Sequence, residues 1–118
     1  MKTCQLPIYL DSYRLTQEVF RCTIKFPKEF KFSLGQSLNE SALDLCCQVS
    51  KASHTQSKEA ILEQVLTLCD RIKIQLRLSA DFKILSCQQQ ATFASLLEKI
   101  TAQAMAWLKS ERRKQPVP

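Results

Sequence analysis

The sequence has almost no glycine: Gly35 is the only one in 118 residues, and proline occurs four times. A fold made of many β-strands needs tight turns, and glycine is one of the residues that form them, so an all-β protein is disfavoured. A phosphate-binding loop between a strand and a helix needs a cluster of glycines, which this chain lacks. We therefore expect an all-α protein.

Long apolar runs are missing as well. No stretch approaches the roughly 20 apolar residues that a membrane-spanning helix needs. No apolar leader segment follows Met1 and Lys2. We therefore expect a cytoplasmic protein with no membrane partner, folded as a single domain over residues 1–118.

Residues for catalysis and metal binding are scarce. His54 is the only histidine and is expected in a solvated loop, so neither a Ser–His–Asp set nor a histidine-rich metal site is indicated. The six cysteines have no CxxC spacing, and we interpret them as small buried hydrophobic residues. The sequence thus predicts no enzyme activity, no catalytic residue, no metal site and no cofactor.

Apolar residues recur at spacings of three and four, the period of amphipathic helices. Four helices are expected, at about 7–26, 28–52, 57–82 and 87–111, with a flexible tail at 112–118. Pro7 and Pro27 mark the start and the end of the first helix, and Ser86 to Gln89 has the spacing of a capping box. Such helices with short links favour an antiparallel up-down-up-down four-helix bundle.

The pattern also predicts which faces are buried. For the first helix we expect an inner face of Tyr9, Tyr13, Thr16, Phe20 and Thr23, and for the second a seam of Leu34, Leu38, Ala42, Leu45, Val49 and Ala52. Gly35 within the second helix indicates a close helix crossing that leaves no room for a Cβ atom. Ser53 or Thr55 is expected to cap the third helix.

The third helix has more apolar residues than one seam requires. One stripe of this helix is expected to face the core. Leu62, Leu66 and Cys69 form a second stripe beside it, and Ile74 and Leu78 lie further round the helix. Because a soluble monomer rarely exposes that much contiguous apolar surface, this second stripe predicts an interface between subunits.

The formal net charge is +6, which favours a polyanionic partner. Lys73 and Arg77 are four residues apart on one helix face, where Asp70 and Asp81 would neutralise them if the stripe is only a salt-bridged surface. A second basic set has spacings of seven, four and three, which place it on one helix face if the helix continues. It consists of Arg14, Arg21, Lys25 and Lys28.

Lys31 completes the candidate basic residues. It lies between Phe30 and Phe32, whose rings we interpret as core or interface residues in preference to platforms for stacked bases. No residue pattern indicates readout of specific bases, so any binding of nucleic acid is expected to depend on phosphate contacts.

Several segments resemble the accessory variability proteins of diversity-generating retroelements, which belong to a group of small four-helix proteins. The resemblance covers residues 6–110. It rests on Leu6 to Tyr9, FPKEFKFSLGQ at 26–36, RIKIQLRLSADFKILS at 71–86 and Trp107. Relatives often have a glycine just before the final tryptophan, where this chain has Ala104, Met105 and Ala106.

The resemblance implies a barrel-like homopentamer of four-helix subunits that is not itself catalytic. Such proteins bind the reverse transcriptase of the retroelement and its template-repeat RNA, with the cDNA as a further candidate ligand, and support adenine-directed mutagenic copying. Lys73 and Arg77 match positions that face the barrel channel in this family. The alternative is a structural protein like those encoded by intervening sequences of 23S ribosomal RNA genes, with no polymerase partner.

Overall fold

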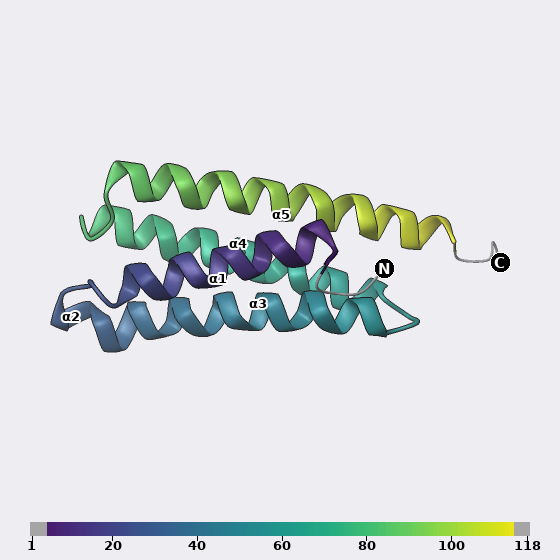
Figure 1. The fold of residues 1–118 in the computed structure, drawn as a ribbon, viewed down its shortest axis with the longest axis horizontal. Helices are drawn as coiled ribbons and strands as arrows, with labels where there is room; N and C mark the ends of the chain where they lie inside the picture. Colours follow the sequence, from purple (N-terminus) through teal and green to yellow (C-terminus); the bar gives the residue numbers. More distant parts are fainter. Residues whose placement is uncertain (1–4, 115–118) are drawn as a thin grey trace.

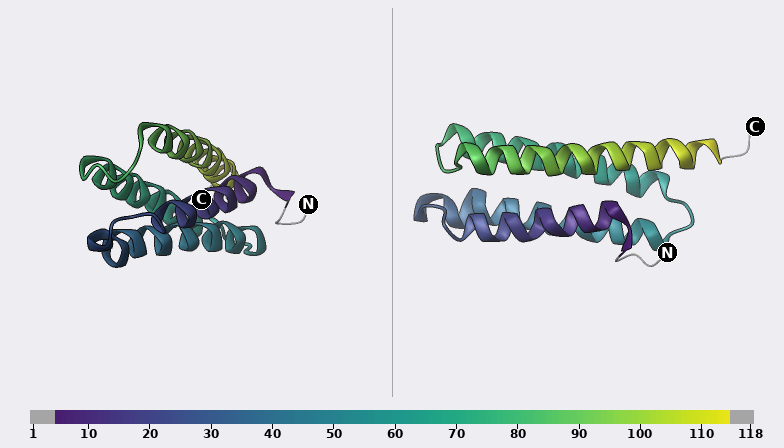
Figure 2. Two further views of the ribbon diagram at one scale, coloured as in Figure 1. Left: turned by 60° about the vertical axis from the view of Figure 1, so that its left-hand side comes forward. Right: turned by 45° about the horizontal axis from the view of Figure 1, so that its top comes forward.

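The structure, a computed structural model, describes residues 5–114 and is all-helical, with no strand in that range. Four long helices form an elongated bundle, as predicted: α1 (Pro7–Thr23), α3 (Gln36–His54), α4 (Glu59–Asp81) and α5 (Cys87–Arg113). Successive long helices run in opposite directions (Figure 1). The α1 helix packs on α3 and α5, and α4 packs on the same two helices, so α1 and α4 lie diagonally across the bundle (Figure 2).

The first helix ends at Thr23, three residues before the predicted end at Phe26. The amides of Lys25 and Phe26 bond to the carbonyls three residues back, of Cys22 and Thr23, at 3.1 Å each. Because Pro27 disfavours helical geometry in the residue before it, the chain tightens into a turn there and does not continue as α-helix. Phe26 is nonetheless buried and packs in the core.

The predicted helix over 28–52 is interrupted. It begins as a short helix, α2 (Lys28–Phe30), widens into the π-helical segment η2 (Lys31–Gly35) and continues as α3. A Cβ added at Gly35 would lie 3.2 Å from Cδ2 of Phe26 and 3.3 Å from the carbonyl oxygen of Phe30. The predicted close approach at this glycine is therefore confirmed. Its nearest neighbours, however, are the side chain of Phe26, in the turn after α1, and the backbone of Phe30.

The inner face predicted for the first helix is wrong at its centre. Thr23 is buried and Tyr9 packs against the core, but Tyr13 and Phe20 are 50% and 40% exposed. The face that packs in the core is a different helical stripe, formed by Ile8, Ser12, Leu15, Val19 and Cys22. Ser12 is accommodated because its hydroxyl donates to the carbonyl oxygen of Ile8 at 2.7 Å, which satisfies the buried polar group.

The second predicted helix buries most of the seam predicted for it. In α3 the seam from Leu38 to Ala52 is fully buried, whereas Leu34, in η2, is half-buried. In α4, however, Leu62 and Cys69 are buried inside the subunit, and Leu66 packs against the core. These three residues are therefore not surplus surface; the exposed apolar side chains of α4 are Ile74 and Leu78.

Helix ends show one confirmed and one wrong prediction. The Ser86 hydroxyl accepts from the Gln89 amide at 3.1 Å, and the Gln89 side chain accepts from the Ser86 amide at 2.9 Å, a complete capping box. In contrast, neither Ser53 nor Thr55 caps α4, because α3 continues to His54 and α4 begins only after Lys58. The Thr55 hydroxyl instead donates to the carbonyl oxygen of Lys51 at 2.7 Å.

The last helix extends into the predicted flexible tail, 112–118, since α5 continues to Arg113. Arg112 bonds across to Glu59 and Glu63 of α4 at 2.9 Å each. These bonds raise the pKa of the Arg112 guanidinium, with the Glu59 hydrogen bond as the largest cause. The remaining residues of the predicted tail, 115–118, lie outside the described range.

Candidate nucleic-acid interface

Lys73 and Arg77 lie on the outer side of α4 and line a groove of about 570 Å³ between α4 and α5. Both side chains are exposed. Their spacing of four residues brings them to the same groove, as one face of a helix requires. The groove therefore unites the two basic residues that the sequence singled out on α4.

The charge of this groove is balanced. Asp70 and Glu98 line it together with Lys73 and Arg77. The Nε atom of Arg77 lies 3.4 Å from Oδ1 of Asp81, in a well-exposed ion pair. Lys73 has no ion pair among residues 5–114. The sequence left open a surface stripe in which Asp70 and Asp81 pair with Lys73 and Arg77. Only part of it is present: Arg77 is paired with Asp81, whereas Lys73 is exposed without an ion pair among residues 5–114.

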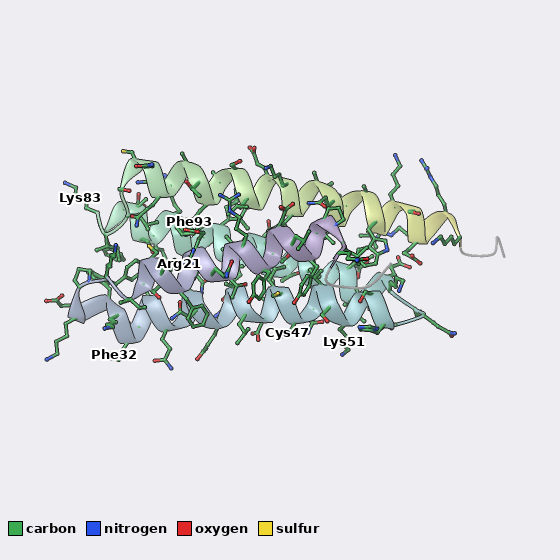
Figure 3. The ribbon with its side chains drawn as sticks, in the orientation of Figure 1. Arg21, Phe32, Cys47, Lys51, Lys83 and Phe93 are labelled. Carbon is green, nitrogen blue, oxygen red and sulfur yellow. The ribbon has the colours of Figure 1, made fainter. Side chains whose placement is uncertain are left out.

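Arg21 and Lys25 line a second groove, of about 500 Å³, between α1 and the start of α5. In Figure 3, Arg21 of α1 lies near Phe93 of α5, and both residues line this groove. Nη1 of Arg21 contacts Oε1 of Glu18 at 2.9 Å. Arg14, seven residues before Arg21 in α1, is also exposed.

The continuous basic face predicted for the first helix does not reach Lys28. Because α1 ends at Thr23, Lys25 lies in the turn and Lys28 begins α2. Lys31 follows in η2, with its Nζ atom 6.0 Å from the centroid of the Phe32 ring. Lys28 and Lys31 therefore lie at the end of the bundle, apart from the α1 helix.

The two rings that flank Lys31 have different surroundings. Phe30 is half-buried and packs on Phe82, with ring centroids 4.9 Å apart. Phe32 is 73% exposed and lies at the end of the bundle that holds α2, where Figure 3 labels it. The interpretation as a packing residue thus holds for Phe30, while Phe32 presents its ring to solvent.

Sequence reasoning missed a third groove, of about 770 Å³, between α4 and the α2–η2–α3 segment. Ile74, Leu78 and Phe82 line it, together with Gln75. The surplus apolar character of α4 was the available signal. The opposite wall includes Phe30 and Leu34, which come from a segment far from α4 in the sequence.

Among the described cysteines, Cys22, Cys46 and Cys69 are buried, as expected, whereas Cys47 and Cys87 are exposed. Cys4 lies outside the described residues. Burial raises the pKa of all three buried thiols above 9.0, which keeps them protonated at neutral pH. Residues 5–114 contain no group of three His, Cys, Asp or Glu side chains arranged for a metal ion.

No helix of the described part of the chain is long and apolar enough to cross a membrane.

Comparison with known proteins identifies the family. No curated protein matches the chain. The bAvd-like family model matches residues 8–111, a range that includes most of all four long helices. It describes accessory variability proteins, which are accessory proteins and not a known enzyme family. A match over most of the chain, on a four-helix bundle, places this protein in the bAvd-like family of accessory variability proteins.

Proposed function

We propose that this protein is the accessory protein of a diversity-generating retroelement, where it binds the reverse transcriptase and the template-repeat RNA, with the cDNA as a further candidate ligand. The observation that carries the proposal is the family match over residues 8–111. In this role the protein is not catalytic; it assembles as a homopentamer and supports adenine-directed mutagenic synthesis by the polymerase.

The basic side chains support binding of RNA. All seven candidate residues are exposed, and only Arg21 and Arg77 among them form ion pairs within the described chain. The set consists of Arg14, Arg21, Lys25, Lys28, Lys31, Lys73 and Arg77. Contacts from such side chains go to phosphates, so we expect affinity with little preference for sequence.

The test replaces Lys73 and Arg77 together by alanine. Each lost phosphate contact should reduce the slope of log K against log salt by about 0.7 to 0.9, so the slope should fall by up to about 2 and RNA binding should weaken. Helical content should not change, because alanine favours helix and both side chains are exposed. Fluorescence anisotropy with the cognate RNA over a salt series measures both quantities.

The matched control is Lys109→Ala with Arg113→Ala. These residues form another exposed Lys/Arg pair four positions apart, on α5, and neither has an ion pair among residues 5–114. If both double variants lose the same affinity, the loss reflects net charge and Lys73 and Arg77 have no special role. A wild-type protein that binds neither RNA nor the neighbouring reverse transcriptase at low salt would overturn the proposed function.

The second candidate function is that of a structural four-helix protein with no polymerase partner. The balanced charge of the α4–α5 groove, where Asp70 and Glu98 offset Lys73 and Arg77, favours it. This alternative predicts an assembled protein that does not capture the reverse transcriptase in a pull-down at low salt, whereas the accessory role predicts capture.

A further inference from the structure

A carboxylate, Glu98, lies on the α5 wall of the groove that Lys73 and Arg77 line from α4. Because a carboxylate repels phosphates, Glu98 weakens the binding of a polyanion by the two basic residues. The Glu98 side chain is exposed and has no hydrogen bond or ion pair among residues 5–114. Its carboxylate oxygens are therefore available to a ligand in the groove.

Glu98 lies opposite Lys73 across this groove. The α4 and α5 helices run in opposite directions (Figure 1), and a hydrogen bond between the side chains of Cys69 and Thr101 fixes which residues face each other. Glu98 precedes Thr101 by three residues, so it lies level with position 72 of α4, about 1.5 Å along the helix axis from Lys73. Arg77 lies about 6 Å further along α4. The acceptor of the α5 wall thus faces the basic pair of the α4 wall.

Asp70, the other carboxylate that lines the groove, has a different position. It also lines the groove on the opposite side of α4, the one formed with α2, η2 and α3. Asp70 therefore lies on the outer ridge of α4 between the two grooves, and Glu98 is the carboxylate that faces the basic pair.

The floor of the α4–α5 groove is apolar, and its α5 wall is low. Leu76 and Leu97 line the groove and are 8% and 6% exposed. Ala94 and Ala102 flank Glu98 about one helical turn away on either side. Because an alanine side chain ends at Cβ, this wall leaves room for a planar group on the floor, and unstacked bases pack on apolar side chains. The groove thus offers cations for phosphates, an apolar floor for a base and an acceptor between them.

We propose that the α4–α5 groove binds a single strand of RNA and distinguishes it from DNA through Glu98. Lys73 and Arg77, about 6 Å apart along α4, contact neighbouring phosphates of the strand. The Glu98 carboxylate accepts a hydrogen bond from a ribose 2′-hydroxyl, the group by which a protein tells RNA from DNA. The inference rests on the RNA binding included in the proposed function and adds selectivity for the sugar, with no preference for a base.

This role explains a carboxylate in a groove that binds phosphates. The repulsion between Glu98 and the phosphates weakens the binding of RNA and DNA alike, whereas only RNA gains the hydrogen bond. The balance therefore favours the template RNA over the cDNA made from it. Removal of a carboxylate that acts by repulsion alone would instead strengthen the binding of both strands equally.

The experiment compares three strands by fluorescence anisotropy with the full-length protein at one salt concentration. They are a short uridine oligonucleotide, its deoxyuridine counterpart and its 2′-fluoro counterpart. The 2′-fluoro strand keeps the sugar pucker of RNA but has no hydroxyl to donate. The wild type should bind the RNA about tenfold more tightly than either other strand, the difference expected for one hydrogen bond to a charged acceptor.

Glu98→Ala should abolish this difference, because the RNA loses its hydrogen bond while the DNA is repelled less. Helical content should not change, since the side chain is exposed and alanine favours helix. Asp70→Ala is the matched control, because it removes the same charge from the same groove. It should strengthen the binding of all three strands equally and keep the ratio of RNA to DNA affinity.

The proposal is overturned if the wild type binds RNA and DNA equally, if it binds the 2′-fluoro strand as tightly as the RNA, or if Glu98→Ala keeps the wild-type ratio. In each of these cases, RNA binding that weakens steeply with salt leaves the proposed function intact. A wild type that binds none of the three strands at low salt, and does not capture the reverse transcriptase, overturns the proposed function as well.

Discussion

Three thiols are buried in positions where desolvation penalises the charged form more than their neighbours favour it. Desolvation is the largest cause of the raised pKa of Cys22, Cys46 and Cys69. For Cys69 a hydrogen bond with Thr101 opposes this effect without cancelling it. The buried thiols therefore act as packing groups, since a protonated thiol is a weak nucleophile and a poor metal ligand.

This burial predicts how stability depends on pH. Above pH 9 the unfolded chain releases thiol protons that the folded chain retains, so the unfolded state binds fewer protons and the free energy of unfolding falls as pH rises. The fall should be shallower in Cys69→Ala than in the wild type, as measured by urea unfolding between pH 8 and about pH 10.5. Cys87→Ala, at an exposed position away from the buried thiols, is the matched control and should keep the wild-type slope. Equal slopes in all three proteins would refute the prediction.

Helix ends decide the boundaries of the elements in this bundle. The start of α5 has a complete capping box, whereas α4 begins at Glu59 and its N-cap residue, Lys58, provides no side-chain cap. At that junction Nζ of Lys58 donates to the carbonyl oxygens of Ala52 and Thr55, at 2.6 Å each. It also lies 5.7 Å from the centroid of the Trp107 ring. The N-cap lysine of α4 thus donates to carbonyl oxygens at and just after the end of α3, where a helix leaves its last carbonyls without an i+4 amide.

The difference between these two helix starts predicts unequal costs of substitution. Ser86→Ala removes an acceptor for a helix-start amide and should lower the free energy of unfolding by about 1 kcal/mol. Thr55→Ala, at the position first expected to cap α4, should cost only a few tenths of a kcal/mol, since its hydroxyl caps no helix start. Chemical denaturation of both variants measures the costs, and equal losses would contradict the assignment of the caps.

The basic residues of one subunit fall into separate sets. Lys73 and Arg77 line the α4–α5 groove, whereas Arg21 and Lys25 line the α1–α5 groove on the other side of α5. Within the described residues, α5 therefore separates the two sets. An assembly of several subunits, as in the proposed function, repeats both sets in every subunit.

Assembly should therefore strengthen RNA binding. Dilution to concentrations at which the subunits separate should weaken RNA binding and lower the salt slope, because fewer phosphates are contacted at once. Sedimentation gives the concentration at which the subunits separate, and anisotropy over a salt series on either side of it measures both slopes. A single-subunit form that binds with the wild-type slope would show that RNA binding does not depend on the assembly.

The sequence alone determined the helical class, the approximate positions of four helices and the cap at Ser86. These features depend on local chemistry: scarce glycine and proline, a 3.6-residue apolar period, and a cap that involves residues three positions apart. The same locality placed Lys73 and Arg77 on one helical face. The groove that they line comes from the packing of α5 beside α4. The helix that Arg14 and Arg21 share could also be predicted in this way.

Only the tertiary structure decided how each helix is rotated about its own axis. In α1 two stripes have helical spacing, and the aliphatic one from Ile8 to Cys22 is buried while Tyr13 and Phe20 face outward. Periodicity cannot choose between such stripes, because the choice depends on the shape of the neighbouring helices and the space between them. The groove at Ile74 likewise depends on α4 meeting the η2 segment, a contact between residues far apart in the sequence.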